Sequence, residues 1–269
     1  MSSEALSARD AIGAATFEEV MAMPAPPPDT LLTSLAIREF EFGELWNRGG
    51  ITRKERRLVT IACVAETGEA ASVDAHVYGA LHTGDLSIDE MQEVVLHFAV
   101  YSGWPKATRL DAAMTTQWQR VQEERGDATK VPAPAIPSNR LTFGERDARG
   151  AVVFDEVMTF PPPEPDIPYS EVGVRGFVFG EMWDRPGLTR KERRFITLAC
   201  VCAADAATPI QSHVYAALNS GDVSLDEVRE VGLHCAVYSG WPKASFFEAV
   251  VRAQWARIES EGGPRTERA

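Results

Sequence analysis

The sequence lacks long hydrophobic runs and is poor in basic residues. Its longest apolar runs, such as VVLHFAVY at residues 94–101, are far shorter than the roughly 20 residues that span a bilayer. The opening MSSEALSARD contains neither the basic nor the apolar region of a secretory leader. A net charge of −12 disfavours nucleic acid and membranes as partners, because both attract positively charged surfaces. We therefore expect a cytoplasmic protein, in which a small anionic substrate would need only a locally positive pocket.

Cysteine and strand patterns are also scarce. The four cysteines, Cys63, Cys200, Cys202 and Cys235, form no C-x-x-C motif. They favour small buried side chains over a disulfide framework or metal ligands, so we expect no metal site. Sustained alternation of apolar and polar residues, the pattern of half-buried strands, is missing as well. The sequence therefore predicts an all-α protein.

What the chain does contain is a long internal repeat. LHFAVYSGWPKA at residues 96–107 returns as LHCAVYSGWPKA at residues 233–244, an offset of 137 positions. The same offset relates five pairs of residues: His76 and His213, His97 and His234, Tyr101 and Tyr238, Trp104 and Trp241, Trp118 and Trp255. A repeat this long indicates duplication of a whole domain rather than a solenoid. We expect domains at 1–126 and 145–269, a proline-rich linker at 127–144 and a pseudo-twofold relation between the halves.

Helix signals account for most of each copy. Thr52 with Glu55, and Ser87 with Glu90, have the capping-box spacing that begins a helix, and the second copy repeats both boxes at Thr189 and Ser224. The helix that follows Ser87 is apolar on most sides, which places it inside the bundle or at an interface. On one of its faces lie Glu93, His97 and Tyr101, repeated as Glu230, His234 and Tyr238.

This face has two interpretations. A carboxylate one turn before an imidazole fixes its tautomer and raises its pKa, as acid–base catalysis requires. The alternative is a core histidine satisfied by a neighbouring acid. His76 and His213 favour catalysis, because they lie mid-helix among small residues and complete a second matched pair. His82 has no counterpart, since Asn219 takes its place, and we interpret it as a surface or accessory residue.

Basic residues cluster at the start of the Thr52 and Thr189 helices. Much of the cluster is expected to form a solvated face, but one arginine of each copy could turn inward and bind a carboxylate with both arms of its guanidinium. Arg56 and Arg193 are the candidates for this role.

Several motifs resemble the carboxymuconolactone decarboxylase family in the same order in both copies. They are FGEMWDRPGLTRKERR at 179–194 with FGELWNR in the first copy, QSHVYAALNSG at 211–221, and the two HxAVYSGWP segments. The resemblance implies an all-helical fold that assembles as trimers or hexamers of single units, and hence a trimer of tandem chains. It also implies decarboxylation of a small unsaturated lactone in aromatic catabolism without metal or organic cofactor.

By this resemblance His76, His97, His213 and His234 are the candidates for proton transfer. Glu44 and Glu181, in the F-G-E-x-W motif, are matched carboxylates that either act as acids or form structural ion pairs. Tyr101, Tyr238, Trp104 and Trp241 are expected to shape the apolar wall of the pocket.

Two departures concern the substrate. Arg57 and Arg194 stand where a glutamate is expected, and Tyr78 and Tyr215 stand where many members have arginine. A related branch, the alkylhydroperoxidase D-like proteins, reduces peroxides with C-x-x-C ahead of a histidine, but no thiol precedes His76 or His213 closely, which disfavours that chemistry. The sequence thus favours a cofactor-free lyase or isomerase acting on an unsaturated lactone or enol acid. The alternative is a non-catalytic helical binding or assembly protein.

Overall fold

The computed structural model describes residues 3–127, 130–134 and 141–267, and within these ranges the chain is helical with no strand. This confirms the predicted all-α class. Part of the predicted linker, residues 128–129 and 135–140, lies outside the described residues. No helix in the described ranges is long and apolar enough to cross a membrane.

The two copies have the same order of elements. The first contains α1 (Ser3–Met21), η1 (Leu32–Phe42), η2 (Leu45–Asn47), α2 (Arg53–Thr67), α3 (Ala70–Thr83), α4 (Ile88–Ser102) and α5 (Trp104–Arg125). The second contains α6 (Phe143–Met158), η3 (Tyr169–Met182), α7 (Arg190–Ala203), α8 (Ala207–Asn219), α9 (Leu225–Ser239), α10 (Trp241–Ser260) and η4 (Arg265–Glu267). All four predicted capping boxes are formed, with the N-cap oxygens accepting from the backbone of the glutamates.

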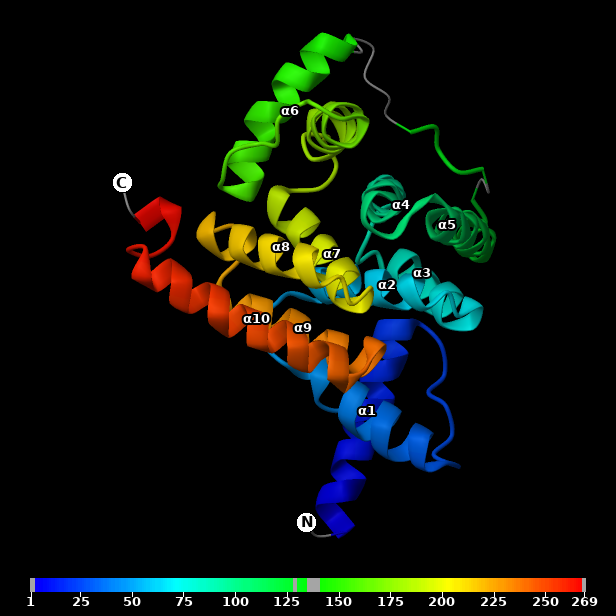
Figure 1. The fold of residues 1–269 in the computed structure, drawn as a ribbon. Coiled ribbons are helices and arrows are strands. Elements are labelled where there is room, and N and C mark those ends of the chain that lie inside the picture. Colours follow the sequence, from blue (N-terminus) through cyan, green and yellow to red (C-terminus); the bar gives the residue numbers. More distant parts are fainter. Residues whose placement is uncertain (1–2, 128–129, 135–140, 268–269) are drawn as a thin grey trace.

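Two π-helices, η1 and η3, are the longest of the elements that the sequence patterns did not predict. Each packs closely on the first helix of its copy, and the pairs α1 with η1 and α6 with η3 lie at opposite ends of the molecule (Figure 1). Glycine permits this approach, because a Cβ on Gly13 would lie 1.6 Å from the Arg38 carbonyl oxygen and one on Gly150 would lie 1.8 Å from that of Arg175. π-Helical segments occur often at functional sites.

The two copies share one core. Helices α2 and α7 pack against each other at the centre, and α4 and α9 each cross to the central helix of the other copy. Lys54 of α2 pairs with Glu192 at 2.5 Å, and Lys191 of α7 pairs in return with Glu55 at 3.2 Å. This reciprocal exchange is what a pseudo-twofold axis produces. Residues of α4 therefore reach the second copy, and residues of α9 reach the first.

Candidate functional site

Each mid-helix histidine meets a tyrosine from the other copy. His213 of α8 lies edge-on to Tyr101 of α4, with ring centroids 5.2 Å apart. His76 of α3 lies in the same way against Tyr238 of α9, at 5.4 Å. The exchange of α4 and α9 brings these pairs together, so each site needs both copies. We call the site of His76 and Tyr238 the first site, and that of His213 and Tyr101 the second site.

Each tyrosine accepts a hydrogen bond from a tryptophan, and an arginine packs on the ring of that tryptophan. In the second site the Trp183 indole N–H donates to the Tyr101 hydroxyl at 2.8 Å, and the Arg194 guanidinium lies over the Trp183 ring at 5.2 Å. Arg194 also donates to Asp222 at 3.1 Å and to the Val157 carbonyl. Because the indole supplies a hydrogen bond to the Tyr101 oxygen, the phenolic proton of Tyr101 remains available for another acceptor.

The first site repeats this arrangement. Trp46 donates to the Tyr238 hydroxyl at 2.8 Å, and Arg57 lies over Trp46 at 5.0 Å while donating to Asp85 at 2.8 Å. Arg57 and Arg194 occupy the positions at which the family resemblance expects a glutamate. In this chain the position holds a buried arginine that packs on the tryptophan, and that tryptophan donates a hydrogen bond to the tyrosine.

A cavity of about 750 Å³ opens at the second site, within the size range of small-molecule pockets. His213 and Tyr101 line it, together with side chains of α6, η3, α7 and the segments between them. The apolar part of the lining is Val100, Phe154, Met158, Phe160, Pro161, Pro163, Val174, Val178, Phe179, Val201, Ala204, Ala206 and Pro209. Among the described residues that line the cavity none is lysine or arginine, so the locally positive pocket that we expected is not formed here.

Burial keeps the cavity imidazole neutral. Desolvation, followed by the charge of Arg194, lowers the pKa of His213 to about 3, and desolvation with Arg57 does the same for His76. A neutral imidazole has one N–H donor and one acceptor nitrogen. The Nδ1 atoms of both rings are buried without a protein partner, which leaves them for a bound molecule or water.

His97 and His234 are fully buried, whereas His76 and His213 keep a small exposed fraction. The Nε2 atom of His97 is 2.9 Å from the Thr197 hydroxyl, and His97 does not line the cavity. The predicted pairing of Glu93 with His97 is wrong, because Glu93 accepts instead from Arg185 at 2.6 Å and Arg193 at 3.0 Å. Desolvation and the Arg193 charge lower the pKa of His97, whereas we expected a carboxylate to raise it.

The role predicted for Arg56 and Arg193 does not fit the structure either. Arg193 is 1 % exposed and donates to Glu93 and to the Arg185 carbonyl at 2.8 Å. Arg56, also 1 % exposed, lies 3.4 Å from Glu230 and donates to the Gly49 carbonyl at 2.8 Å. These guanidinium groups hold carboxylates and carbonyls of the protein itself, so they do not reach a substrate.

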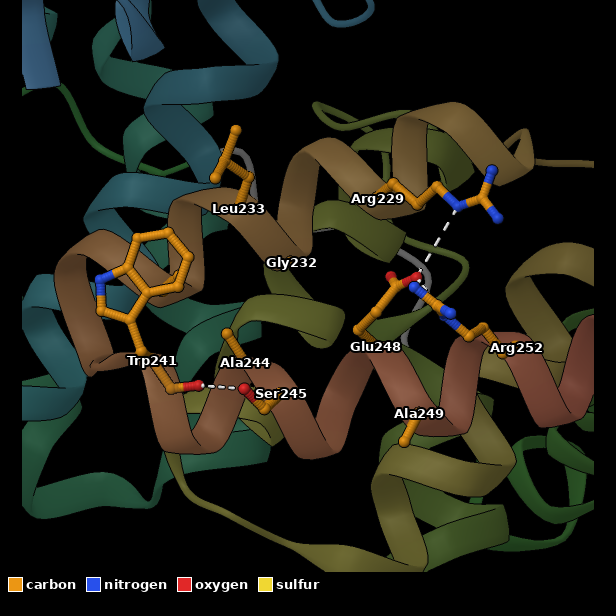
Figure 2. Close-up of a pocket in the computed structure, with 10 residues that line it drawn as sticks. Arg229, Gly232, Leu233, Trp241, Ala244, Ser245, Glu248, Ala249 and Arg252 are labelled. Carbon is orange, nitrogen blue, oxygen red and sulfur yellow. Dashed lines mark hydrogen bonds and ion pairs between the residues drawn. The ribbon is translucent and has the colours of Figure 1, made fainter. Parts of the chain in front are cut away.

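The predicted glutamates and tryptophans lie outside the histidine sites. Glu44 pairs with Arg9 at 2.7 Å and Glu181 with Arg146 at 2.9 Å, so both form the structural ion pairs that were the alternative. Trp104 and Trp241 are 60 % and 59 % exposed and do not line the histidine cavity. Figure 2 shows Trp241 at one end of a separate groove between α9 and α10, and the ion pair of Arg229 with Glu248 lies at the other end.

Sequence reasoning missed three kinds of site residue: the tryptophans Trp46 and Trp183, the arginines Arg57 and Arg194 as supports, and Glu41. Glu41, on η1, accepts from the Tyr238 hydroxyl at 2.6 Å, and its register position in the second copy is Val178. The sequence gives only a weak signal for it, because Glu41 is one of several polar residues that an apolar residue replaces in the second copy, as Ala203 replaces Glu66 and Phe246 replaces Arg109.

The four cysteine thiols are buried in the core and are not placed for catalysis. All four cysteines are buried, and burial raises the pKa of Cys200 while neighbouring thiols and burial raise that of Cys235. Thiolates are the reactive species, so these residues are suited to packing rather than peroxide reduction. Within the described ranges no group of three or more His, Cys, Asp or Glu side chains is arranged to hold a metal ion.

Comparison with known proteins identifies the relatives of this chain. A model of the carboxymuconolactone decarboxylase family matches residues 33–116 and 173–266, which together make up more than half of the chain. A 4-carboxymuconolactone decarboxylase of Acinetobacter baylyi is 39% identical over 72 residues, which are 27% of this chain and 53% of that protein. A nitrosuccinic acid decarboxylase of Metarhizium robertsii is 38% identical over 81 residues, 30% of this chain and 54% of that protein. The chain thus matches these curated relatives over about half of their length.

Proposed function

This chain belongs to the carboxymuconolactone decarboxylase family, and on that premise we propose that it is a decarboxylase of small unsaturated lactones or enol acids that needs no metal or organic cofactor. The observation that carries the proposal is the second site, where a neutral imidazole and a phenol meet in an apolar cavity of about 750 Å³. Both curated relatives are named as decarboxylases of small acids.

The apolar lining favours loss of CO2. An ionised carboxylate is strongly solvated in water, and the described residues of the cavity wall, which include no lysine or arginine, do not replace that solvation. Loss of CO2 leaves an electron pair that spreads over the rest of the substrate, where a diffuse charge costs less in such surroundings. The cavity therefore disfavours the starting carboxylate more than the transition state.

His213 and Tyr101 supply hydrogen bonds to the charge that develops. When the electron pair moves onto a carbonyl oxygen of the substrate, a neutral imidazole N–H and a phenolic O–H stabilise that oxygen without carrying charge themselves. The low pKa of His213 keeps its ring neutral at physiological pH. Trp183 fixes the Tyr101 hydroxyl by its own hydrogen bond, so the phenol is oriented before the substrate binds.

The experiment that tests the proposal is release of CO2 from 4-carboxymuconolactone and from nitrosuccinate by the purified chain. We expect the double variant His76→Gln with His213→Gln, which removes the imidazole of both sites, to lower turnover by about 10²-fold or more. His82→Gln is the matched control, because His82 lies at the surface beside Glu124, away from both sites. Binding of these acids without any release of CO2 would contradict the proposal and favour a binding protein.

A further inference from the structure

The first site contains a carboxyl group, whereas the described residues that line the second site include none. Glu41 lies on η1, and the residue at the same register position in η3 is Val178, which lines the cavity of the second site. His76 and Tyr238 have identical counterparts in His213 and Tyr101. Glu41 is therefore a chemical difference between the copies that directly contacts the tyrosine of the first site.

The contacts of Glu41 fix the direction of the hydrogen bonds. The Trp46 indole donates to the Tyr238 oxygen at 2.8 Å, and the Tyr238 hydroxyl donates to Oε1 of Glu41 at 2.6 Å. In the first site the phenolic proton is thus committed to Glu41. Because Oε1 already accepts this bond, a proton on the carboxyl group resides on Oε2 and can be donated onward.

Among the described residues, no arginine or lysine forms an ion pair with Glu41, and the nearby cations pair with other acids. In the part of the chain that the structure describes, the charged and titratable groups of η1 and of the elements around it include Arg38 and Glu39 of η1, Glu44 after η1, and Arg9, Asp10, Glu18 and Glu19 of α1. Tyr238 of α9 contacts Glu41 directly, and Arg57 of α2 lies over the Trp46 ring. Arg38 pairs with Asp10 at 2.6 Å, and Arg57 donates to Asp85 at 2.8 Å. Arg9 pairs with Glu44 at 2.7 Å.

The surroundings of Glu41 therefore favour its neutral form. Burial raises the pKa of Glu41 to about 7, and the hydrogen bond from Tyr238 only partly opposes this. A carboxylate substrate brings a further negative charge into the site and raises the pKa of Glu41 again. With such a substrate bound, the carboxyl group is protonated at neutral pH.

We propose that Glu41 is the proton donor of the first site, and that the first site is the half of the protein that completes decarboxylation. This rests on the proposed function. The C–C bond to the carboxylate breaks and CO2 leaves, and the electron pair that remains is delocalised on the substrate. That pair then takes the proton from Oε2 of Glu41, a C–H bond forms, and the Glu41 carboxylate recovers a proton from water.

The second site binds the same class of substrate but returns the proton slowly. Its hydrogen-bond donors are a phenol whose pKa is raised by burial and an imidazole that stays neutral. Neither is matched to neutral pH as a proton donor. Duplication has thus produced one site with an internal acid and one without it.

The test compares kcat and KM for CO2 release from 4-carboxymuconolactone in Glu41→Val, Glu41→Gln, Glu41→Asp and Val178→Glu. Glu41→Val converts the first site to the composition of the second, and the isosteric Gln variant guards against a folding defect. We expect both to lower kcat by about 10²-fold or more with KM changed only a few-fold, and Asp to restore part of the loss. Val178→Glu combined with Glu41→Val should recover turnover.

A second readout separates proton donation from a structural role. In the unmodified chain kcat should fall as the pH rises above the pKa of the donor, and Glu41→Gln should remove this dependence. Glu18→Gln, at an exposed acid of α1, is the control. Turnover that survives Glu41→Val overturns the assignment to Glu41 and leaves the proposed function standing. Absence of CO2 release from the unmodified chain overturns both.

Discussion

Replacing Glu41 by glutamine should stabilise the protein at neutral and alkaline pH and leave its stability nearly unchanged in acid. Glutamine keeps an oxygen that accepts from Tyr238 but cannot ionise. The unfolded chain binds a proton at Glu41 with the ordinary pKa of 4.5, and the folded chain does so with a pKa of about 7. The folded state therefore holds more protons between these values, and its stability falls as the pH rises through this window.

The size of the effect follows from the shift in pKa. A shift from 4.5 to about 7 corresponds to about 3 kcal/mol, because each pKa unit is worth about 1.4 kcal/mol. Below about pH 4.5 Glu41 is neutral in both states and the difference between the two proteins is small. Above about pH 7 the folded carboxylate costs the full amount, so the variant should be more stable than the unmodified chain by up to about 3 kcal/mol.

Urea unfolding followed by far-UV circular dichroism at several pH values measures this difference. The quantity to compare is the free energy of unfolding of Glu41→Gln minus that of the unmodified chain, with Glu18→Gln as the control at an exposed acid. A difference that grows between acid and neutral pH supports the reasoning. A difference that is the same at all pH values would mean that Glu41 ionises normally, and would refute it.

Three further predictions concern the fold and assembly. Glu93→Gln should lower the free energy of unfolding by about 3–5 kcal/mol, measured by thermal unfolding, because it leaves Arg193 buried without its carboxylate. Asp74→Asn, which breaks the exposed pair with Arg109, should lower it by less than about 1 kcal/mol. Equal losses in the two variants would contradict a core in which the two halves interlock. Gly13→Ala should destabilise by about 1–3 kcal/mol or more, because its Cβ meets the Arg38 carbonyl, while Gly144→Ala, with nothing within 4 Å, should be neutral or stabilising. Sedimentation equilibrium should give three times the chain mass of 29.5 kDa, as the family resemblance implies, and a monomer would contradict it.

The repeat and the helix starts could be predicted because they depend on residues close together in sequence. The boxes at Thr52, Ser87, Thr189 and Ser224 need only a side chain and the backbone three residues later, and all four are formed. The matched histidines could likewise be found from the sequence, because the members of each pair are separated by the same 137 positions. The π-helices were missed because neither begins with a side-chain cap, and because their packing on α1 and α6 depends on tertiary contacts.

The partners of the buried arginines could not be predicted in this way. Arg193 and Glu93 are separated by 100 positions and meet only because α4 crosses to α7. Periodicity says which residues share a face of one helix, so it placed Glu93 beside His97 but could not show that Arg185 and Arg193 bind that carboxylate. For the same reason it could not separate Trp46 and Trp183, which reach the tyrosines, from the exposed Trp104 and Trp241.

The most direct test of a paired imidazole and phenol as decarboxylation sites is CO2 release by the double variant His76→Gln with His213→Gln. Circular dichroism must first show that the variant is folded. The account predicts that release from 4-carboxymuconolactone falls to the uncatalysed rate, while the surface variant His82→Gln retains the rate of the unmodified chain. Undiminished release by the folded double variant would contradict it.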